Sequence, residues 1–380
     1  MNSKTLLFSL AVLCSGIFLM AMIIHDVQAQ EDKMLNVMFP NRSALQGYTF
    51  DPAPVLIKVD IGASKNIPFN IPIPDKEWQR MPQEEFVEGT QILAGFIHPQ
   101  GPDQGMIQVM AYRPPYELGP GDWLLYTLEQ GGMKVITSSG EGIDGSGPFF
   151  EALAVSELPE GSPQMPMMMR AAVFRHGDTF VMVRCMASSQ VYLNLSYYFG
   201  VTIHRFEFQN VKLPVLIGQW EKHCIADYCC NAPRSGFSPI ASKQKAVVEH
   251  SLPLDLEGVR TGLLNIKVVQ SPLAEQTPAQ TRINNILYNM VEKSGMSFDK
   301  DLVALKGEHE NLGGAAYYAR NRGIGADKTA IEFFALSWEG DGPAVLVYML
   351  TDAREKNPVA WMANKRTFEI ISQSLSRNIQ

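Results

Sequence analysis

The stretch MMMRAAVFRHGDTFVMVRCMA, residues 167–187, contains two apolar runs that are separated by the turn residues His176, Gly177 and Asp178. Runs of this kind, rich in β-branched residues and joined by a glycine-containing turn, predict a β-hairpin. A second stretch, TAIEFFALSWEGDGPAVLVYML at residues 329–350, has the same plan around another glycine-rich turn. The sequence therefore predicts two similar hairpins, one in each half of the chain.

Each predicted hairpin is followed by a segment with the apolar spacing of an amphipathic helix, at residues 192–206 and 359–375. An earlier helix that ends at glycine and leads into a strand is predicted in each half, within residues 122–135 and 282–298. The same order of helix, strand, hairpin and final helix indicates an internal duplication. Residues 211–241 are predicted to connect the two copies.

The first copy opens with IPFNIPIPDKEWQRMP (residues 67–82), a strand that ends in prolines and a tryptophan. ILAGFIHPQGPDQGMIQVMAY (residues 92–112) follows as two strands around a Gly/Pro turn. This order of elements resembles the PsbP/DcrB family of small extracytoplasmic domains, over residues 66–208 and 243–376. The resemblance implies an α+β fold of two tandem similar domains, each an antiparallel sheet covered by helices. It also implies a non-catalytic accessory role at a membrane-associated assembly.

The N-terminus has the order of an export signal. Lys4 precedes an uncharged apolar run at residues 6–24, and Ala29 is a small residue suited to cleavage. The run is also nearly long enough to span a bilayer, so a retained anchor is the alternative. Either predicts a periplasmic or secreted protein, with anchoring to the inner membrane in the second case. The predicted segments are 1–29 (signal peptide or membrane anchor), 30–65 (N-terminal extension), 66–210 (first PsbP/DcrB-like domain), 211–241 (cysteine-containing connector) and 242–380 (second PsbP/DcrB-like domain).

Outside the export segment the chain has four cysteines, Cys185, Cys224, Cys229 and Cys230. Cysteines in an oxidising compartment are usually paired, and adjacent cysteines bond to each other only with strained geometry. We therefore expect one of Cys229 and Cys230 to bond to Cys224 and the other to bond to Cys185. One disulfide with free thiols is an alternative. A zinc or copper site that uses His223 with the cysteines is another.

A methionine cluster provides a second metal-binding alternative. Met165, Met167 and Met169 lie at the start of the first hairpin, and thioether sulfur suits Cu(I). His176, in the turn of the same hairpin, is the additional candidate ligand. The competing interpretation is that the methionines fill gaps in the core with their flexible side chains. A periplasmic copper or zinc binding protein is therefore the alternative function.

Composition and motifs narrow the classes of function. The chain has a net charge of −7, and its lysines and arginines are scattered, which argues against nucleic-acid binding. Residues 140–145 have dinucleotide-binding spacing, but the sequence after them predicts a strand where a helix is needed. No nucleophile elbow, zinc-protease histidine pair or phosphate-binding loop occurs in the sequence. We expect no cofactor and no enzymatic activity; a hydrolase with an unrecognised site is a further alternative.

Two aromatic pairs, Tyr197 with Tyr198 and Tyr317 with Tyr318, are the candidates for an interaction surface. Structural packing is the competing interpretation for at least one member of each pair. Together with the export signal and the two small domains, these features predict a scaffold. Its expected partner is another envelope or membrane-complex protein.

Overall fold

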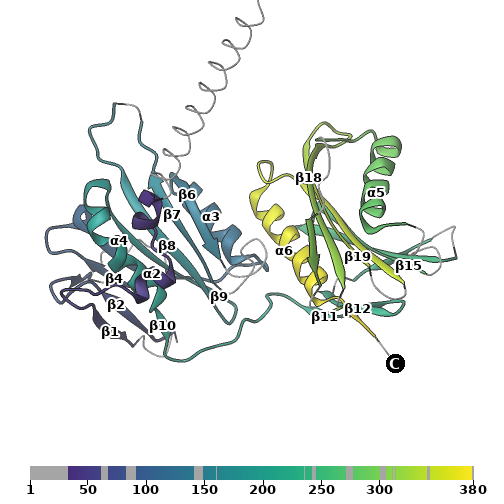
Figure 1. Ribbon diagram of the computed structural model, residues 1–380. Helices are drawn as coiled ribbons and strands as arrows, with labels where there is room; N and C mark the ends of the chain where they lie inside the picture. Colours follow the sequence, from purple (N-terminus) through teal and green to yellow (C-terminus); the bar gives the residue numbers. More distant parts are fainter. Residues whose placement is uncertain are drawn as a thin grey trace, which may run out of the picture.

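The chain forms two halves that lie side by side and are joined by an extended segment (Figure 1). No helix among the described residues is both long and apolar enough to span a membrane. The predicted export signal at residues 1–29 lies outside the described part. The computed structural model describes residues 33–60, 67–82, 91–140, 149–159, 161–234, 236–241, 245–270, 277–299, 305–309, 311–312, 314–339 and 343–378.

The first half is built on a seven-stranded antiparallel sheet with the order β3-β4-β5-β9-β8-β7-β6. The hairpin predicted at residues 167–187 is its central pair, β8 and β9. The turn of this hairpin contains Gly177, whose φ of 64° favours glycine. The strands are β3 (Gln79–Arg80), β4 (Gln91–Ile97), β5 (Met106–Tyr112), β6 (Met133–Gly140), β7 (Phe149–Ser156), β8 (Met167–His176) and β9 (Thr179–Ser188).

The second half is built on an eight-stranded antiparallel sheet with the order β13-β14-β15-β20-β19-β18-β16, in which β17 also pairs with β18. The second predicted hairpin is its β19–β20 pair. The strands are β13 (Ser238–Ile240), β14 (Val247–Leu256), β15 (Val259–Val269), β16 (Ser297–Phe298), β17 (Leu305–Glu308), β18 (Ala315–Ile324), β19 (Ala330–Glu339) and β20 (Ala344–Asp352).

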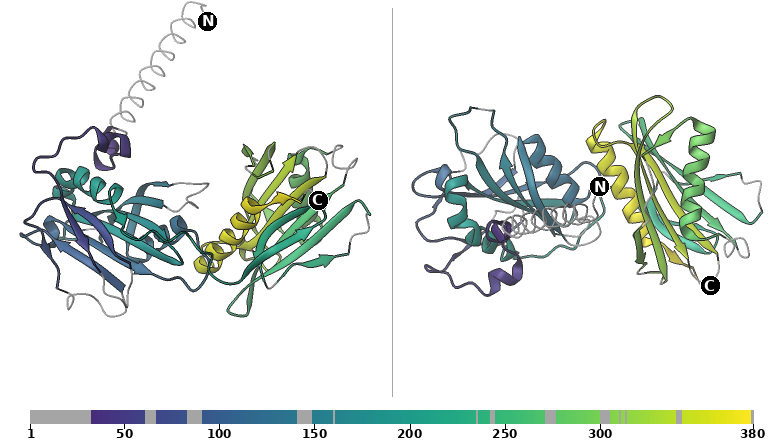
Figure 2. Two further views of the ribbon diagram at one scale, coloured as in Figure 1. Left: turned by 90° about the horizontal axis from the view of Figure 1, so that it is seen from below. Right: turned by 45° about the horizontal axis from the view of Figure 1, so that its top comes forward.

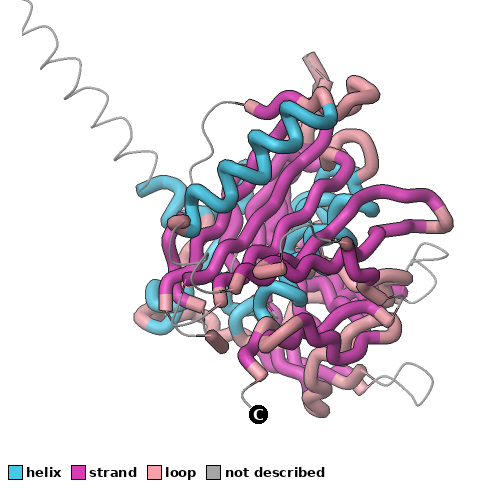
Figure 3. The backbone as a smooth tube through the Cα atoms, turned by 90° about the vertical axis from the view of Figure 1, so that its right-hand side faces the viewer, coloured by secondary structure: helices cyan, strands magenta, loops and turns pink. Residues whose placement is uncertain are grey.

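Helices pack on both faces of each main sheet. In the first half, α3 (Pro120–Gln130) packs on β6, β7 and β8, and α4 (Ser189–His204) packs on the other face of β8 and β9. In the second half, α6 (Pro358–Ser374) faces the first half, whereas α5 (Ala279–Ser294) lies across the strands on the outer face (Figures 1 and 3). These positions match the predicted helices, and Asn357 caps α6 by accepting the backbone N–H of Ala360.

Each half also contains a three-stranded sheet made from its first hairpin and its last strand. In the first half, β1 (Val55–Val59), β2 (Phe69–Ile73) and β10 (Glu207–Phe208) have the order β1-β2-β10. In the second, β11 (Trp220–Ile225), β12 (Tyr228–Pro233) and β21 (Ser376–Arg377) have the order β11-β12-β21. The cysteine segment is therefore more than a connector, because its hairpin opens the second half.

The two halves share one strand order. Strands β4, β5, β9, β8 and β7 of the first main sheet correspond in sequence and position to β14, β15, β20, β19 and β18 of the second. The last helices, α4 and α6, follow the corresponding strands β9 and β20. This agreement is the result that an internal duplication predicts.

The predicted α+β class, with each antiparallel sheet covered by helices, is wrong. The chain folds mostly into antiparallel strands, arranged in four sheets with few helices, and is closer to an all-β protein. The error has a physical cause. Residues 69–70 pair through their backbones with residues 207–208, and residues 228–229 pair with residues 376–377; local apolar periodicity does not report pairing at such distances in the sequence.

Candidate functional site

A buried network of charged side chains lies where the two halves meet. Glu117, three residues before α3, accepts hydrogen bonds from Nη1 and Nη2 of Arg175 at 2.5 and 2.7 Å, and both side chains are buried. Its carboxylate also accepts the backbone N–H of Ile217 at 2.8 Å and Nε of Arg366 at 3.3 Å. One carboxylate therefore links the first main sheet, the segment that joins the halves, and α6.

The network continues along α6. Nζ of Lys365 lies 2.7 Å from Oδ2 of Asp122 on α3 and 3.0 Å from Oε1 of Glu369. Burial raises the pKa of Glu369, although Lys365 and Arg366 oppose this change. Burial alone would lower the pKa of Lys365, but Glu369 and Asp122 raise it above its ordinary value. Lys365 therefore stays charged at neutral pH and joins α6 to α3.

Apolar packing completes the junction. Trp123 of α3 and Trp361 of α6 belong to one cluster of buried apolar residues that includes members of both halves. The junction is visible from two further directions in Figure 2. At its edge, Nη2 of Arg354 lies 2.8 Å from Oε2 of Glu129. Because this pair is partly exposed, it stabilises the junction less than the buried groups do.

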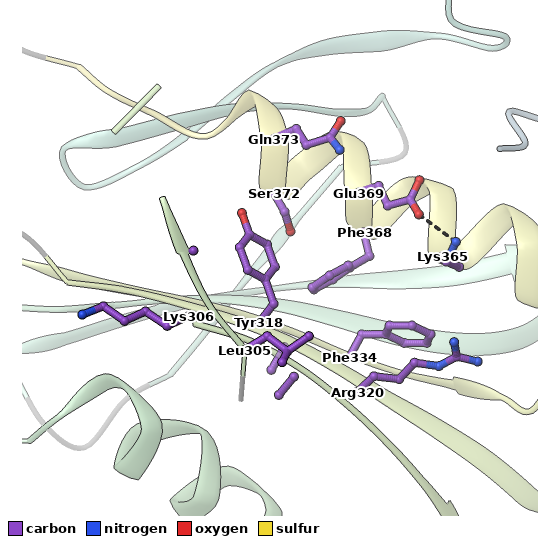
Figure 4. Close-up of a pocket in the computed structure, with 13 residues that line it drawn as sticks. Leu305, Lys306, Tyr318, Arg320, Phe334, Lys365, Phe368, Glu369, Ser372 and Gln373 are labelled. Atoms are coloured by element: carbon purple, nitrogen blue, oxygen red, sulfur yellow. Dashed lines mark ion pairs between the residues drawn. The ribbon is translucent and has the colours of Figure 1, made fainter. Parts of the chain in front are cut away.

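An apolar pocket of about 500 Å³ opens beside this network, between α6 and strands β17, β18 and β19. Figure 4 shows Tyr318, Phe334 and Phe368 with their rings directed into the space under α6, and the Lys365–Glu369 ion pair at one end. The polar side chains that line the pocket are Lys306, Arg320, Lys365, Glu369, Ser372 and Gln373.

A smaller pocket of about 340 Å³ is lined by residues of both halves, among them Gln130 of α3 and Arg320 of β18. Arg320 borders both pockets. Its Nη2 lies 2.9 Å from Oε2 of the buried Glu332, and its guanidinium lies 5.4 Å from the ring centroids of Phe334 and Trp361. These contacts hold the Arg320 side chain in place between the two pockets.

The cysteines form one disulfide, between Cys224 and Cys229. These residues face each other in the β11–β12 hairpin, whereas Cys230 faces His223. Cys185 and Cys230 are buried free thiols, so the second expected disulfide, to Cys185, is not formed. The reason is their location, because Cys185 lies in the core of the first main sheet and Cys230 lies in the small sheet of the second half.

Alkylation with iodoacetamide tests this assignment. Burial raises the pKa of Cys230 to about 12 and also raises the pKa of Cys185, so neither thiol should react in the native protein. In denatured, unreduced protein we expect alkylation of Cys185 and Cys230, and alkylation of Cys224 and Cys229 only after reduction. Peptide mass spectrometry distinguishes the four positions. Protection of Cys185 or Cys230 in the denatured, unreduced chain would contradict the assignment.

The methionine and histidine ligands considered for copper do not converge. Met167 starts β8 and His176 ends it, so a ten-residue strand, about 30 Å long, separates them. Nε2 of His176 lies 2.7 Å from the backbone oxygen of Asn210. Met165 is exposed, whereas Met169 is buried in the core, as the competing interpretation expected. The extended strand thus keeps the predicted ligand set apart.

His223 lies in a different pair. Its Nε2 is 3.0 Å from Nδ1 of His250, and its ring stacks on Phe237. Burial and the neighbouring His250 lower the pKa of His223, and burial lowers the pKa of His250. Both rings are therefore neutral at pH 7 and share a hydrogen bond. Within the described ranges, no group of three or more His, Cys, Asp or Glu side chains is arranged to hold a metal ion.

The four candidate tyrosines have different environments. Tyr197 stacks on Tyr48 at 4.2 Å, and the hydroxyl of Tyr198 donates to the backbone oxygen of Pro52 at 3.1 Å. This first pair therefore holds the N-terminal segment against α4. Tyr317 is half-buried on the α5 face, and Tyr318 lines the 500 Å³ pocket. Only Tyr318 belongs to the candidate site.

The charged residues of the site were not predicted from the sequence. One signal was present: Lys365 and Glu369 recur at helical spacing beside the apolar positions of the predicted helix at residues 359–375. Charges on the buried side of a helix indicate a polar partner. Their partner on α3, Asp122, lies 243 positions away in the sequence and could not be inferred from this pattern.

Comparisons with known proteins place the chain in no family. No family model matches it, and no curated protein matches it. Among solved structures it is similar to the cyanobacterial PsbP protein CyanoP from Synechocystis sp. PCC 6803, with 15% identity over 43% of this chain and 95% of that chain, at a TM-score of 0.31. It is also similar to PA94, a protein of unknown function and putative regulator from Pseudomonas aeruginosa, with 13% identity, 40% and 96% coverage, and a TM-score of 0.22.

A third similarity is to a chain of the Tle4-Tli4 complex, with 12% identity over 80% of this chain and 100% of that chain, at a TM-score of 0.22. At these scores the similarities carry no argument about this chain. The tandem PsbP/DcrB assignment therefore stays a prediction.

Proposed function

We propose that this protein is an exported, non-catalytic binding protein that holds another protein of an envelope or membrane-associated complex at the junction of its two halves. One observation carries the proposal. The buried network around Glu117 and Lys365 fixes α6 against the first half, and the same helix borders an open apolar pocket of about 500 Å³ beside Lys365 and Glu369. A rigid body beside an open apolar site is suited to binding.

Pre-organisation supports this function. Association costs free energy when a binding surface must first be ordered, and a surface that is already fixed avoids this cost. Both pockets border Arg320, and the smaller one is lined by both halves, so a partner at this position would contact the two halves together. Apolar rings at the centre with charged groups around them also match the usual composition of a protein interface.

The polar groups of the larger pocket favour binding over chemistry. Lys365 is held charged by Asp122 and Glu369, which removes it as a nucleophile at neutral pH. Glu369 is likewise engaged by Lys365 and Arg366. The proposal therefore gives these residues a structural role and assigns no cofactor to the site.

Photo-crosslinking in the producing cell tests the proposal. A photoreactive amino acid at the exposed Gln130, on the rim of the smaller pocket, should capture one specific protein. The same group at Tyr288, which is 61% exposed on the outer helix α5, is the control and should not capture it. Equal capture at both positions, or none at Gln130 and at the rim of the larger pocket, would contradict binding at the junction.

A further inference from the structure

The two halves differ at one corresponding place. In each half, the last helix covers part of one face of the main sheet and leaves the edge strands beside it. In the first half, the N-terminal residues 33–48 lie over this region and contact α4, β7 and β8. In the second half, the corresponding region beside α6, over β17, β18 and β19, is the open 500 Å³ pocket. Residues 33–48 thus cover part of this region in the first half, where a pocket of about 560 Å³ remains beside Phe39, Glu151 and His204, whereas in the second half the region over Arg320 is open.

Residues 39–45 cover Arg170 and part of α4 through specific contacts. The ring of Phe39 lies 4.4 Å from the guanidinium of Arg170, and Nη2 of Arg170 donates to the backbone oxygen of Pro40 at 3.1 Å. Leu45 is buried against Gly200 of α4, where an added Cβ would lie only 2.9 Å from its side chain. A short peptide segment therefore supplies an aromatic ring, a carbonyl group and an aliphatic side chain.

The open pocket has matching features. An Arg–Glu pair lies on the same face of both sheets, with the charges exchanged between the strands: Glu151 on β7 pairs with Arg170 on β8, and Arg320 on β18 pairs with Glu332 on β19. The Arg170 side chain is 0% exposed under its covering segment, whereas the Arg320 side chain is 50% exposed. Arg320 is therefore accessible to a group that would cover it.

A second observation also favours a polar group of a ligand in this pocket. Ser372 of α6 is 2% exposed and lines the pocket, and its hydroxyl has no hydrogen-bond partner among the described residues. Figure 4 shows it beside Tyr318 under the helix. A buried hydroxyl without a partner costs free energy, and a polar group of a bound molecule can remove this cost.

We propose that this pocket binds a short segment of the partner protein, in the manner in which residues 39–45 cover the first half. An aromatic or aliphatic side chain of that segment packs between Tyr318, Phe334 and Phe368. A backbone carbonyl next to it accepts a hydrogen bond from Arg320, and a backbone N–H donates to Ser372. An acyl chain would fill the apolar space but could not satisfy the Ser372 hydroxyl. This inference rests on the proposed function, because it names the kind of partner.

Gly307 provides the test. A Cβ at this position of β17 would lie 3.8 Å from Cε2 of Tyr318, so a larger side chain would extend over the pocket without a backbone clash. A photoreactive group at Leu305, which is 71% exposed at the rim, reports contact with the partner. We expect Gly307→Phe to reduce crosslinking from Leu305 by roughly tenfold or more, and Gly307→Ala to leave it nearly unchanged. Arg320→Ala is a second variant that should reduce the crosslinking from Leu305.

The outcomes separate the two proposals. The inference is supported if the captured protein is the one that Gln130 captures, and if the crosslinked site lies in a segment with an exposed apolar residue. Capture at Gln130 that is insensitive to Gly307→Phe, in a variant with an unchanged unfolding midpoint, overturns the inference and retains the proposed function. Absence of capture at both positions overturns both. A lipid that copurifies with the wild type and is lost from Gly307→Phe overturns the peptide assignment.

Discussion

Glu117→Ala is expected to lower the free energy of unfolding by about 3–5 kcal/mol, as is typical when one partner of a buried ion pair is removed. The variant leaves Arg175 buried at 7% exposure, with the backbone oxygens of Gly177 and Val215 as its remaining acceptors. It also removes the contacts to Ile217 and Arg366 that link the joining segment and α6. Urea denaturation followed by circular dichroism measures the loss.

Glu129→Ala is the matched control for this prediction. Glu129 lies at the same junction and pairs with Arg354, but its side chain is 47% exposed. We expect Glu129→Ala to lower the free energy of unfolding by at most about 1 kcal/mol, because water already screens this pair. Equal effects of the two substitutions would show that burial of the Glu117 network does not determine the stability of the junction.

Arg170→Met, in the first half, is also expected to lower the free energy of unfolding by about 3–5 kcal/mol. The guanidinium donates to Oε2 of Glu151 through Nε and Nη2 at 2.9 and 2.8 Å, and Nη2 also reaches the backbone oxygen of Pro40. Without Arg170, the carboxylate of Glu151 stays buried with His204 as its remaining ion-pair partner among the described residues, and Phe39 loses its contact with the guanidinium. We expect faster proteolysis before residue 48 together with the loss of stability.

A double variant separates charge from packing. Replacing both partners, Arg170→Met with Glu151→Leu, removes the charge that the single variant leaves buried and should recover much of the lost stability. A double variant that is no more stable than Arg170→Met would contradict this account of the pair.

The pH dependence of stability follows from the pKa of Glu151. Burial would raise this pKa, but the hydrogen bond to His204 and the charge of Arg170 lower it below its ordinary value of 4.5. A lowered folded-state pKa stabilises the protein above the ordinary value, and this stabilisation is lost as the pH falls below it. Between pH 5 and pH 3, the wild type should therefore lose more stability than the double variant.

The local elements of this fold could be predicted from the sequence, whereas pairing at long range could not. The turn at Gly177 and the apolar spacing at residues 192–206 act over a few positions, and the observed hairpin and helix follow them. By contrast, residues 376–377 carry no strand pattern of their own. They become a strand because β12 offers its backbone groups there. Because the sequence did not predict the two three-stranded sheets, the predicted fold class was wrong.

In the candidate site, too, local features could be predicted from the sequence and long-range contacts could not. Tyr318 could be nominated as an aromatic residue of a repeated pair, and it does line the pocket. The role of Arg320 depends on the rings of Phe334 and Trp361 and on Glu332, which only the folded sheet brings around it. The ligands considered for copper are dispersed for the opposite reason. Met167 and His176 are near in sequence, but a fully extended strand separates them.

The small sheets have a consequence for the kinetics of folding. Each one joins the first hairpin of its half to the last strand; in the second half, the hydroxyl of Ser376 donates to the backbone oxygen of Cys229 across 147 positions. Contacts of such high contact order form slowly, because a long loop must close before they can be made. The β11–β12 hairpin can therefore complete its sheet only after residues 376–377 have reached it. Until then the β12 edge is unpaired, and an unpaired strand edge favours aggregation.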